Sequence, residues 1–495
     1  MNSEMLPNYI KMASPNPVEN RAPWYKNTAP AYAGIFLWVV FYMTIADGTL
    51  NKAGLGLSLL GLVAAAFICY FLFYLVPGLY GMKTGYPLYV IGSSAYGTAG
   101  GFIIPGLLMG ILQFGWLSVN TAVSSDFIVQ AAGQPSATDA VTGEFHGSMA
   151  FTIVAVLWAL AAIFVALKGI HYLGKVSTFL PIVPLAMLLI VFFSNVGSAG
   201  EYQTPTNGNP IFGMLTVITI VVGFFATAGA AGVDFGMANR NKKDIHLGGL
   251  FGIALAIIVA GGLAIVATAG THAKHPELQG YTFDAVISAQ KGFLSQIMFI
   301  LFAAASFAPA CFCSFIAGNS IDTLFPKISR TIAMLIGAAA AIILAATGVA
   351  LNLVGFFTII GAFFGPICGA MAADYLLSGC KWSGPRKGVN WAGYISLIVG
   401  FVVAILPMVK ADWFGFISPA PVIAFIIGFV LYIILAKAGL EPEVVPVTAE
   451  SLPETGSEKI PESPKAETAS EEAQSQPPQD TTDEKPEENQ SDKPE

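Results

Sequence analysis

The sequence predicts an all-α protein that crosses a membrane many times, and three observations predict this fold class. First, 55% of the 495 residues are hydrophobic and only 11% are charged, whereas soluble proteins carry about 25% charged residues. Second, the apolar residues occur in runs of roughly 20, which is the length that a helix needs to cross the hydrocarbon core. Third, Lys and Arg are concentrated in every second connection between these runs. Loops on the cytoplasmic side of membrane proteins are rich in these residues.

Twelve apolar runs are long enough to be membrane spans. In chain order they cover residues 31–50, 53–76, 101–131, 149–167, 176–195, 211–235, 248–270, 292–318, 331–350, 352–378, 392–409 and 417–436. Residues 1–30 are polar and form a predicted cytoplasmic N-terminal arm, so we expect the first span to act as its own insertion signal. The transmembrane domain is therefore predicted over residues 31–436, with a Gly-rich loop or short interfacial helix over residues 77–100.

Positive charge predicts the orientation of this domain. With the N-terminus inside, the arm, the inside connections and residue 437 hold 15 Lys and Arg, whereas the outside connections hold 4. Cytoplasmic loops carry an excess of Lys and Arg. We therefore predict an integral protein of the cell membrane (the inner or plasma membrane) with both termini in the cytoplasm.

Residues 437–495 form a predicted disordered tail. From residue 441 onwards the tail contains 16 Asp and Glu, 4 Lys and almost no aromatic residues. Such a segment cannot bury enough apolar surface to fold. The tail is either a regulatory, partner-binding segment or a solvated extension without a role in transport, and its acidity accounts for the negative net charge.

Two spans are interrupted in their middle by polar and small residues, at 41–49 and at 227–234. Broken helices persist in a membrane only where they line a protected, hydrated cavity. Two of them in corresponding halves of a chain are typical of the binding site of a secondary transporter. Thr227 and Gly229 are small enough to let the backbone contact a ligand, although small residues also serve close helix packing.

The third span carries a polar stripe. Gln113, Trp116, Asn120 and Ser124 follow an i, i+3, i+7, i+11 pattern, which places them on one helix face within about 80°. Trp116 offers a flat surface and Gln113 offers both a donor and an acceptor, so the pair suits a small planar heterocycle. Stacking a base on an aromatic ring contributes about 1–3 kcal/mol. Alternatively, the amides hydrogen-bond neighbouring helices and Trp116 serves packing.

Candidate cation-coupling residues lie in the first and eighth spans. Asp47 either binds a proton or sodium ion or is hydrated near the outer surface, beside Lys52. Pro309 frees a backbone carbonyl near Ala305, and this carbonyl with the Ser306 hydroxyl makes a suitable pair of sodium ligands. A proline kink that serves only packing is the alternative.

The sequence contains no visible grouping of nucleophile, acid and base. Its five cysteines lie within or at the ends of spans, without the spacing of a zinc site. We therefore expect a protein that is not an enzyme and that has no metal and no cofactor beyond a co-transported H⁺ or Na⁺. The expected partners are a small molecule and the lipid bilayer, without nucleic acid, and the oligomeric state stays open.

Five short motifs, spread over residues 20–437, carry a family resemblance. They are Gly81-Met82-Lys83-Thr84-Gly85, Gln113-Phe114-Gly115-Trp116, residues 225–235, Ala373-Asp374-Tyr375-Leu376 and Val389-Asn390-Trp391. In order and spacing they resemble nucleobase–cation symporter family 1, and within it the cytosine (purine–cytosine) permeases. The resemblance implies the APC-superfamily fold, in which spans 1–5 and 6–10 form an inverted repeat and spans 11 and 12 are peripheral.

The same resemblance implies alternating access and the cation-coupled import of a nucleobase or a related ring, such as cytosine, a purine or a hydantoin. Gln113 would bind the ring edge beside Trp116, and Tyr42, Phe225 and Thr227 would close the site.

Two departures from the family pattern affect these expectations. The family commonly has adjacent hydroxyls in the eighth span, where this chain has Ala305 and Ser306, and Phe302 stands where an asparagine can occur. With the extra carboxylate of Asp47, this favours protons over sodium. Residues 226–233 and 302–309 also carry fewer hydroxyls and amides than some cytosine permeases, so a purine, a hydantoin or another ring is an alternative to cytosine.

Two other functions remain open. An amino-acid or amine symporter of the same fold would need a site for a carboxylate and an ammonium group, and the pairing of Trp116 with Gln113 argues against it. A channel or a membrane receptor belongs to another class, and the sequence lacks the repeated pore motifs that channels usually have.

Overall fold

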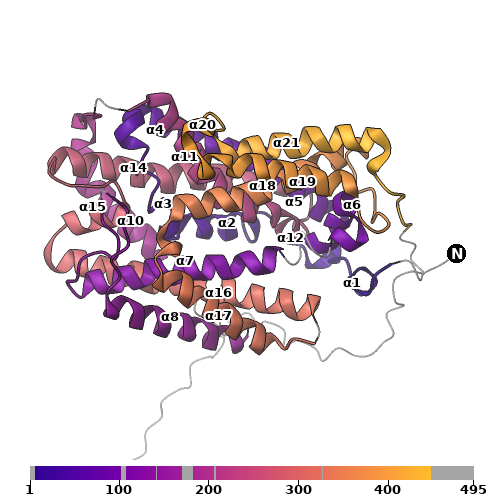
Figure 1. Cartoon of the computed structure of the whole chain (residues 1–495), viewed down its shortest axis with the longest axis horizontal. Coiled ribbons are helices and arrows are strands. Elements are labelled where there is room, and N and C mark those ends of the chain that lie inside the picture. The colour runs from indigo at the N-terminus through magenta and orange to yellow at the C-terminus, as the bar shows by residue number, and fades with distance from the viewer. Residues whose placement is uncertain are drawn as a thin grey trace, which may run out of the picture. The chain divides into compact units, whose positions relative to one another are not determined.

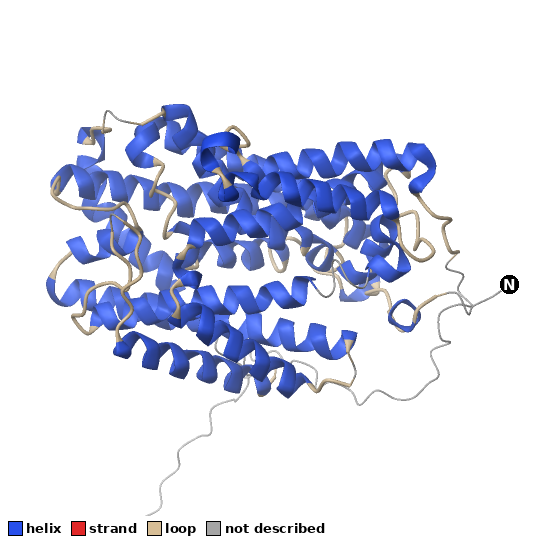
Figure 2. Ribbon diagram, in the orientation of Figure 1, coloured by secondary structure: helices blue, strands red, loops and turns tan. Residues whose placement is uncertain are grey.

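A computed structural model describes residues 6–101, 108–140, 142–169, 182–205, 208–325 and 327–446. Within these ranges the regular structure is helical, and β pairing is limited to three isolated bridges. The long helices lie side by side, and the all-α prediction is confirmed (Figures 1 and 2). The predicted tail beyond residue 446 lies outside the described residues.

The helices follow one another along the chain with short connections. They are α1 (Asn8–Lys11), α2 (Thr28–Leu37), α3 (Val39–Tyr42), α4 (Leu50–Ile68), α5 (Leu75–Thr84), α6 (Leu88–Gly101), α7 (Leu108–Ala131), α8 (Met149–Leu167), α10 (Ile182–Asn195), α11 (Pro210–Ala230), α12 (Gly232–Gly236), α13 (Lys242–Gly249), α14 (Ala256–Lys274), α15 (Phe283–Ala289), α16 (Gly292–Leu324), α17 (Arg330–Ala346), α18 (Leu353–Leu377), α19 (Trp391–Val409), α20 (Ala411–Phe414) and α21 (Ala420–Leu435). Three π-helical segments cover Cys69–Tyr74, Leu250–Leu255 and Ala436–Leu440. Three 3₁₀ turns cover Val18–Asn20, Val196–Glu201 and Val349–Leu351.

Nine helices in the described ranges are long and apolar enough to cross a membrane. Two shorter apolar helices, α2 and α17, coincide with the first and ninth predicted spans, and α7 coincides with the third. Every predicted span thus overlaps a helix, although residues 102–107 and 176–181 of the third and fifth spans are not described. The number of spans that cross the membrane stays a prediction.

The break in the first span begins earlier than the sequence predicts. Helix α2 ends at Leu37, Trp38 is extended with φ −68° and ψ 127°, and one further helical turn, α3, precedes an irregular stretch over residues 43–49. Gly48 has φ +66° in this stretch, a conformation that glycine adopts without steric cost. The next helix starts at Leu50, three residues before the predicted span.

The break in the sixth span is narrower than predicted. Helix α11 continues through Thr227 and Gly229 to Ala230, and only Ala231 separates it from α12. The predicted interruption over residues 227–234 is therefore corrected to one residue. Alanine favours the helix, and Gly229 serves packing, because a Cβ there would lie 2.8 Å from Phe73 Cβ.

Two long rods share an unusual feature. Helices α4 and α5 join through the π-helical segment Cys69–Tyr74 into one rod over Leu50–Thr84, and α13 and α14 join through Leu250–Leu255 into one rod over Lys242–Lys274. A short helix follows each rod: α6 lies between the first rod and α7, and α15 lies between the second rod and α16. The segment 77–100, predicted as an interfacial loop or a short helix, is helical: residues 77–84 continue the first rod, and the short helix α6 follows.

The helix bundle has two ends, which we name after the short helices located there. The α15 end contains residues 275–291, and the α6 end contains residues 85–101 and 379–390; they lie on opposite sides in Figure 1. An apolar cluster at the α6 end includes Ile10, Val90 and Val445. The two ends of the described chain therefore meet on one side of the bundle, and the first residues of the predicted tail belong to the folded body.

The close packing of α5 against α12 gives a first test. A Cβ on Gly81 would lie 1.9 Å from the carbonyl oxygen of Val233, so we expect Gly81→Ala to destabilise the protein by at least the roughly 1–3 kcal/mol typical of overpacking. Thermal unfolding of the detergent-purified protein measures this. Gly34→Ala, in α2, is the matched control, because a Cβ there meets no atom of the described residues within 4 Å.

Candidate functional site

Trp116 lies at the centre of an aromatic cluster. It is 6% exposed, and its ring centroid is 4.9 Å from Phe356, 5.3 Å from Phe224 and 5.7 Å from Trp38. These rings come from α18, α11 and the break of the first span. Trp116 of the polar stripe is thus packed against the residue that follows α2 and against α11, close to the breaks in the first and sixth spans.

Phe224 is the ring of the sixth span that contacts Trp116, and the sequence analysis missed it. Phe224 also lies 5.0 Å from Phe41. Its neighbour Phe225, which was predicted for the site, is fully buried and packs against Tyr32 and Phe36, with 5.7 Å between ring centroids in both cases. Two consecutive phenylalanines point to different faces of a helix, and sequence pattern alone could not say which face meets Trp116.

Gln113 retains a largely unpartnered amide. The side chain is 9% exposed, and within the described residues its one hydrogen bond runs from Nε2 to Met109 Sδ at 3.8 Å. Sulfur is a weak acceptor. The amide therefore keeps a donor and an acceptor available to a ligand.

Thr227 supplies a second polar group without a partner. Its Oγ1 is buried and makes no hydrogen bond to any residue that the structure describes, and leaving such a group unpaired costs about 1–3 kcal/mol. Thr227 follows Phe224 by three positions and Gln113 precedes Trp116 by three, so each lies one helical turn from a ring of the cluster. Helix α7 runs toward α15, because Asp126 near its end shares Gln130 with Asp284, whereas α11 runs toward α6, because Asp234 of the following α12 bonds Leu88. Both polar groups therefore lie on the α6 side of the contact between Trp116 and Phe224.

Asn120 is held by neighbouring helices. Its Nδ2 donates to the Ser306 carbonyl at 2.7 Å, and its Oδ1 accepts hydrogen bonds from Trp158 Nε1 at 3.0 Å and Ser124 Oγ at 3.4 Å. The residue is completely buried. Asn120 therefore fits the alternative interpretation of the stripe, in which its amides hydrogen-bond neighbouring helices, here α8 and α16.

Ser306 anchors the first-span break. Its hydroxyl donates to the Phe302 carbonyl at 2.9 Å and accepts a hydrogen bond from Trp38 Nε1 at 3.2 Å. Ala305 beside it is 7% exposed. The Ser306 hydroxyl oxygen, which is predicted to bind a cation, thus accepts a hydrogen bond from the indole of Trp38, directly after α2.

Asp47 has different partners. The backbone N–H groups of Gly48 and Tyr281 face its half-buried carboxylate, and Lys52 and Asp284 lie near it. No hydrogen bond or ion pair joins it to Ser306 in the described part of the chain. Asp47 therefore connects the irregular stretch of the first span to the α15 end.

Tyr42 lies under α15. It is 1% exposed, its ring centroid is 5.0 Å from Phe283, and its hydroxyl donates to the Leu37 carbonyl at 3.4 Å. The backbone N–H of Phe283 donates to the carbonyl of Met43 at 2.8 Å. Helix α15 thus covers the first-span break from its own end of the bundle.

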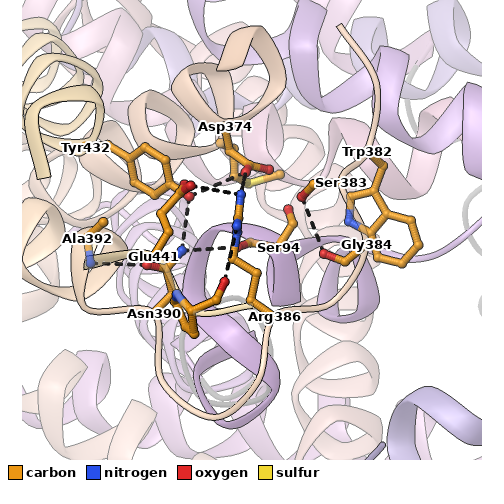
Figure 3. Close-up of polar contacts among 12 residues, drawn as sticks. Ser94, Asp374, Trp382, Ser383, Gly384, Arg386, Asn390, Ala392, Tyr432 and Glu441 are labelled. Carbon is orange, nitrogen blue, oxygen red and sulfur yellow. Dashed lines mark hydrogen bonds and ion pairs between the residues drawn. The ribbon is translucent and has the colours of Figure 1, made fainter. Parts of the chain in front are cut away.

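A largely buried network of ion pairs and hydrogen bonds lies at the α6 end (Figure 3). The guanidinium of Arg386 lies between the carboxylates of Asp374 and Glu441, with N–O distances of 3.2 Å and 3.1 Å. Arg386 also donates to the Ser94 carbonyl at 3.1 Å, and Tyr80 donates to Asp374 at 2.9 Å. The network thereby joins α6, α18, the first rod and the segment after α21.

Residues of the sequence motifs assemble at this end. Asp374 belongs to the ion-pair network, and Asn390 donates to the Ser94 carbonyl at 3.2 Å. Lys83 donates to the Tyr375 hydroxyl at 2.9 Å. Asp234 accepts a hydrogen bond from the backbone N–H of Leu88 at 2.9 Å, at the start of α6, where a carboxylate is favourable. Asp374, Asn390, Lys83 and Asp234 therefore hold elements together at the α6 end and take no part in the aromatic cluster.

The helical bundle, with its broken first span and a polar stripe among aromatic rings, has the features of an integral membrane transporter. A family model described as "Permease for cytosine/purines, uracil, thiamine, allantoin" matches residues 15–428. The chain belongs to this family.

Curated and solved proteins agree with this assignment. The chain is 25% identical over 331 residues to the cytosine permease of Escherichia coli K12 and to that of Escherichia coli O157:H7, over 65% of this chain and 72% of the relatives. It is similar to Mhp1, a nucleobase-cation-symport-1 family transporter, in a closed conformation with bromovinylhydantoin bound (TM-score 0.61, 17% identity, 88% of this chain and 96% of that chain). It also resembles the inward-facing conformation of Mhp1 (TM-score 0.66, 15% identity, 92% and 100%). These likenesses show the transporter fold.

The network at the α6 end gives a second test. Removing one partner of a buried ion pair leaves an uncompensated charge and costs about 3–5 kcal/mol, so we expect Arg386→Met to lower the thermal unfolding temperature strongly. Lys387→Met, which removes an exposed neighbouring charge, is the matched control. Equal unfolding temperatures for the two variants would contradict the structural role of the network.

Proposed function

We propose that the protein imports a nucleobase or a related planar heterocycle by cation symport with alternating access. The observation that carries the proposal is the pairing of unpartnered polar groups with aromatic surface: the amide of Gln113 and the hydroxyl of Thr227 each lie one turn from the contact between Trp116 and Phe224.

The chemistry of these groups fits such a ring. Nucleobases and hydantoins are flat and carry adjacent N–H and C=O groups on their edges. An amide side chain pairs with both at once, and an aromatic face binds the ring by stacking, worth about 1–3 kcal/mol. The cytosine specificity of the curated relatives and the hydantoin bound to Mhp1 support this substrate class.

Each predicted site residue then has a role. Trp116 stacks on the ring, Gln113 binds its edge and Thr227 offers a further hydrogen bond. Asn120 positions α7, and Tyr42 closes the site beneath α15. Phe225 and Gly229 pack the sixth span against the first and second spans, so they support the site without contacting the substrate.

A five-plus-five inverted repeat underlies alternating access in this proposal. Spans 2 and 7 would be equivalent in such a repeat, and these are the two rods with a π-helical segment followed by the short helices α6 and α15. The interrupted first and sixth spans are equivalent in the same way. Spans 11 and 12 would be peripheral, giving twelve in all.

A proton is the coupling ion that we favour over sodium. The Ser306 hydroxyl is engaged with Trp38 and Phe302, and the adjacent Ala305 has no side-chain oxygen to offer a metal ion. We assign the α6 end to the cytoplasm of a cell membrane, because it carries the excess of Lys and Arg and both ends of the described chain.

Uptake into proteoliposomes tests the function. Labelled cytosine, uracil, adenine, hypoxanthine, allantoin and a hydantoin are supplied with the proton and sodium gradients varied separately. We expect uptake of at least one ring, driven by an inward proton gradient. Absence of uptake for the whole panel would contradict the proposal, and uptake that needs sodium and persists without a proton gradient would overturn the choice of ion.

Substitution of Gln113 tests the site. We expect Gln113→Ala to abolish uptake at low substrate concentration, because the ring edge is left unpaired in a buried site at a cost of about 1–3 kcal/mol, which lowers affinity about 5- to 150-fold. The control is Gln203→Ala, at an exposed amide in the connection before α11. Wild-type uptake by a correctly inserted Gln113→Ala protein would remove Gln113 from the site.

Two truncations test the tail. Deleting residues 447–495 leaves Glu441 on Arg386, so we expect uptake and thermal stability close to those of the full chain. Deleting residues 441–495 removes this ion pair and the bond from Arg386 to the Pro442 carbonyl, and we expect a lower unfolding temperature. Strongly reduced uptake after the shorter deletion would instead indicate that the acidic segment has a role in transport.

A further inference from the structure

A second group of buried carboxylates lies at the α15 end, outside the substrate site. Asp126, in the last turns of α7, is 2% exposed. It accepts hydrogen bonds from the backbone N–H of Ala137 at 2.6 Å, from Ser136 Oγ at 3.1 Å and from Gln130 Nε2 at 2.8 Å. These three donors fix the position of its carboxylate.

Asp284, on α15, shares one of these donors. Its Oδ2 lies 3.4 Å from the same Gln130 Nε2, so a single nitrogen connects the carboxylates of α7 and α15. The side chain is 8% exposed, and its Oδ1 is buried without a hydrogen-bond partner in the described residues. A buried carboxylate oxygen that faces no donor is costly while it is charged.

No positive side chain compensates this pair. Neither Asp126 nor Asp284 makes an ion pair within the described part of the chain. Among the other titratable groups at this end, His272 Nε2 contacts the Gly280 carbonyl at 2.9 Å, Asp47 adds a third acid, and Lys52 lies near Asp47. Two buried carboxylates without a cation cannot both stay ionised at low cost, so the arrangement calls for a bound positive charge.

We propose that Asp126 and Asp284 form a proton-binding site that couples transport to the closure of the α15 end. The two carboxylates hold one proton between them, and Asp126 keeps its three donors. The site takes a bare proton, because the pair already shares a neutral amide and offers too few free oxygens for Ca²⁺ or Mg²⁺, which take six or more.

The position of α15 connects this proton to the substrate site. Phe283, next to Asp284, donates its backbone N–H to the Met43 carbonyl and packs on Tyr42. A shared proton lets α7 and α15 stay together over the first-span break. Loss of the proton restores repulsion between the carboxylates and favours their separation. Protons entering from the α15 end thus stabilise the state in which this end is closed.

The inference rests on the proposed proton symport, and its test separates the two. Wild-type protein, Asp284→Asn and Asp126→Asn are reconstituted in liposomes that contain a pH-sensitive dye, and a ring from the panel that the wild type imports is added outside. We expect both variants to lose substrate-driven proton entry, and their uptake to lose its dependence on external pH between about pH 5 and pH 8. Asp412→Asn, at an exposed acid after α19, should behave as the wild type does.

A second measurement does not depend on transport. The folded protein holds a proton on the pair that the unfolded chain releases, so wild-type stability falls as pH rises above the unfolded value, about 3.9 for Asp. Asn carries no such proton. We therefore expect the unfolding temperature of the wild type to fall relative to that of Asp284→Asn between about pH 5 and pH 8.

Proton entry that persists in both Asn variants, with parallel unfolding temperatures across pH, would overturn the inference and leave the proposed symport intact. A wild type that imports the ring without any proton entry would overturn both the inference and the choice of proton. Sodium-driven uptake by the wild type that is unchanged in both Asn variants would also overturn the inference and the choice of proton.

Discussion

The structure depends on how the interrupted first span satisfies its backbone and indole groups inside an apolar bundle. Hydrocarbon offers no hydrogen bonds, so a broken helix must find partners in the protein or in a hydrated cavity. Trp38, directly after the end of α2, donates a hydrogen bond to Ser306 of α16, and the carbonyl of Met43, where the chain becomes irregular, accepts one from Phe283, the first residue of α15. The break is thereby tied to the eighth span on one side and to α15 on the other.

Hydrogen-bond satisfaction distinguishes the polar residues of the stripe. Asn120 uses both ends of its amide on neighbouring helices, whereas Gln113 has only a sulfur atom as a partner in the described residues. Both are amides, both are buried and both lie on the same helix face. The polar group that lacks partners is the one available to a ligand, because a native structure seldom leaves such groups unpaired without a reason.

The two ends of the bundle differ in their electrostatics. At the α6 end, Arg386 compensates two carboxylates, and the glycines of the motifs let helices approach closely, as at Gly81 against Val233. At the α15 end, Asp126 and Asp284 are buried together without a cation in the described chain. The carboxylates at the α6 end thus share a cation within the protein, whereas those at the α15 end have none among the described residues.

Composition and periodicity determined the all-α membrane class, the approximate positions of the helices, the stripe of α7 and the existence of a break near Asp47, because hydrophobic length and helical period are local properties of a sequence. The family resemblance drew attention to Gln113 and Trp116. Only the tertiary structure decided that the sixth span stays helical to Ala230, that Phe224 rather than Phe225 meets Trp116, and that Asp126 and Asp284 share one amide. These features arise from contacts between residues far apart in the chain, and no local pattern encodes which faces of two helices will meet.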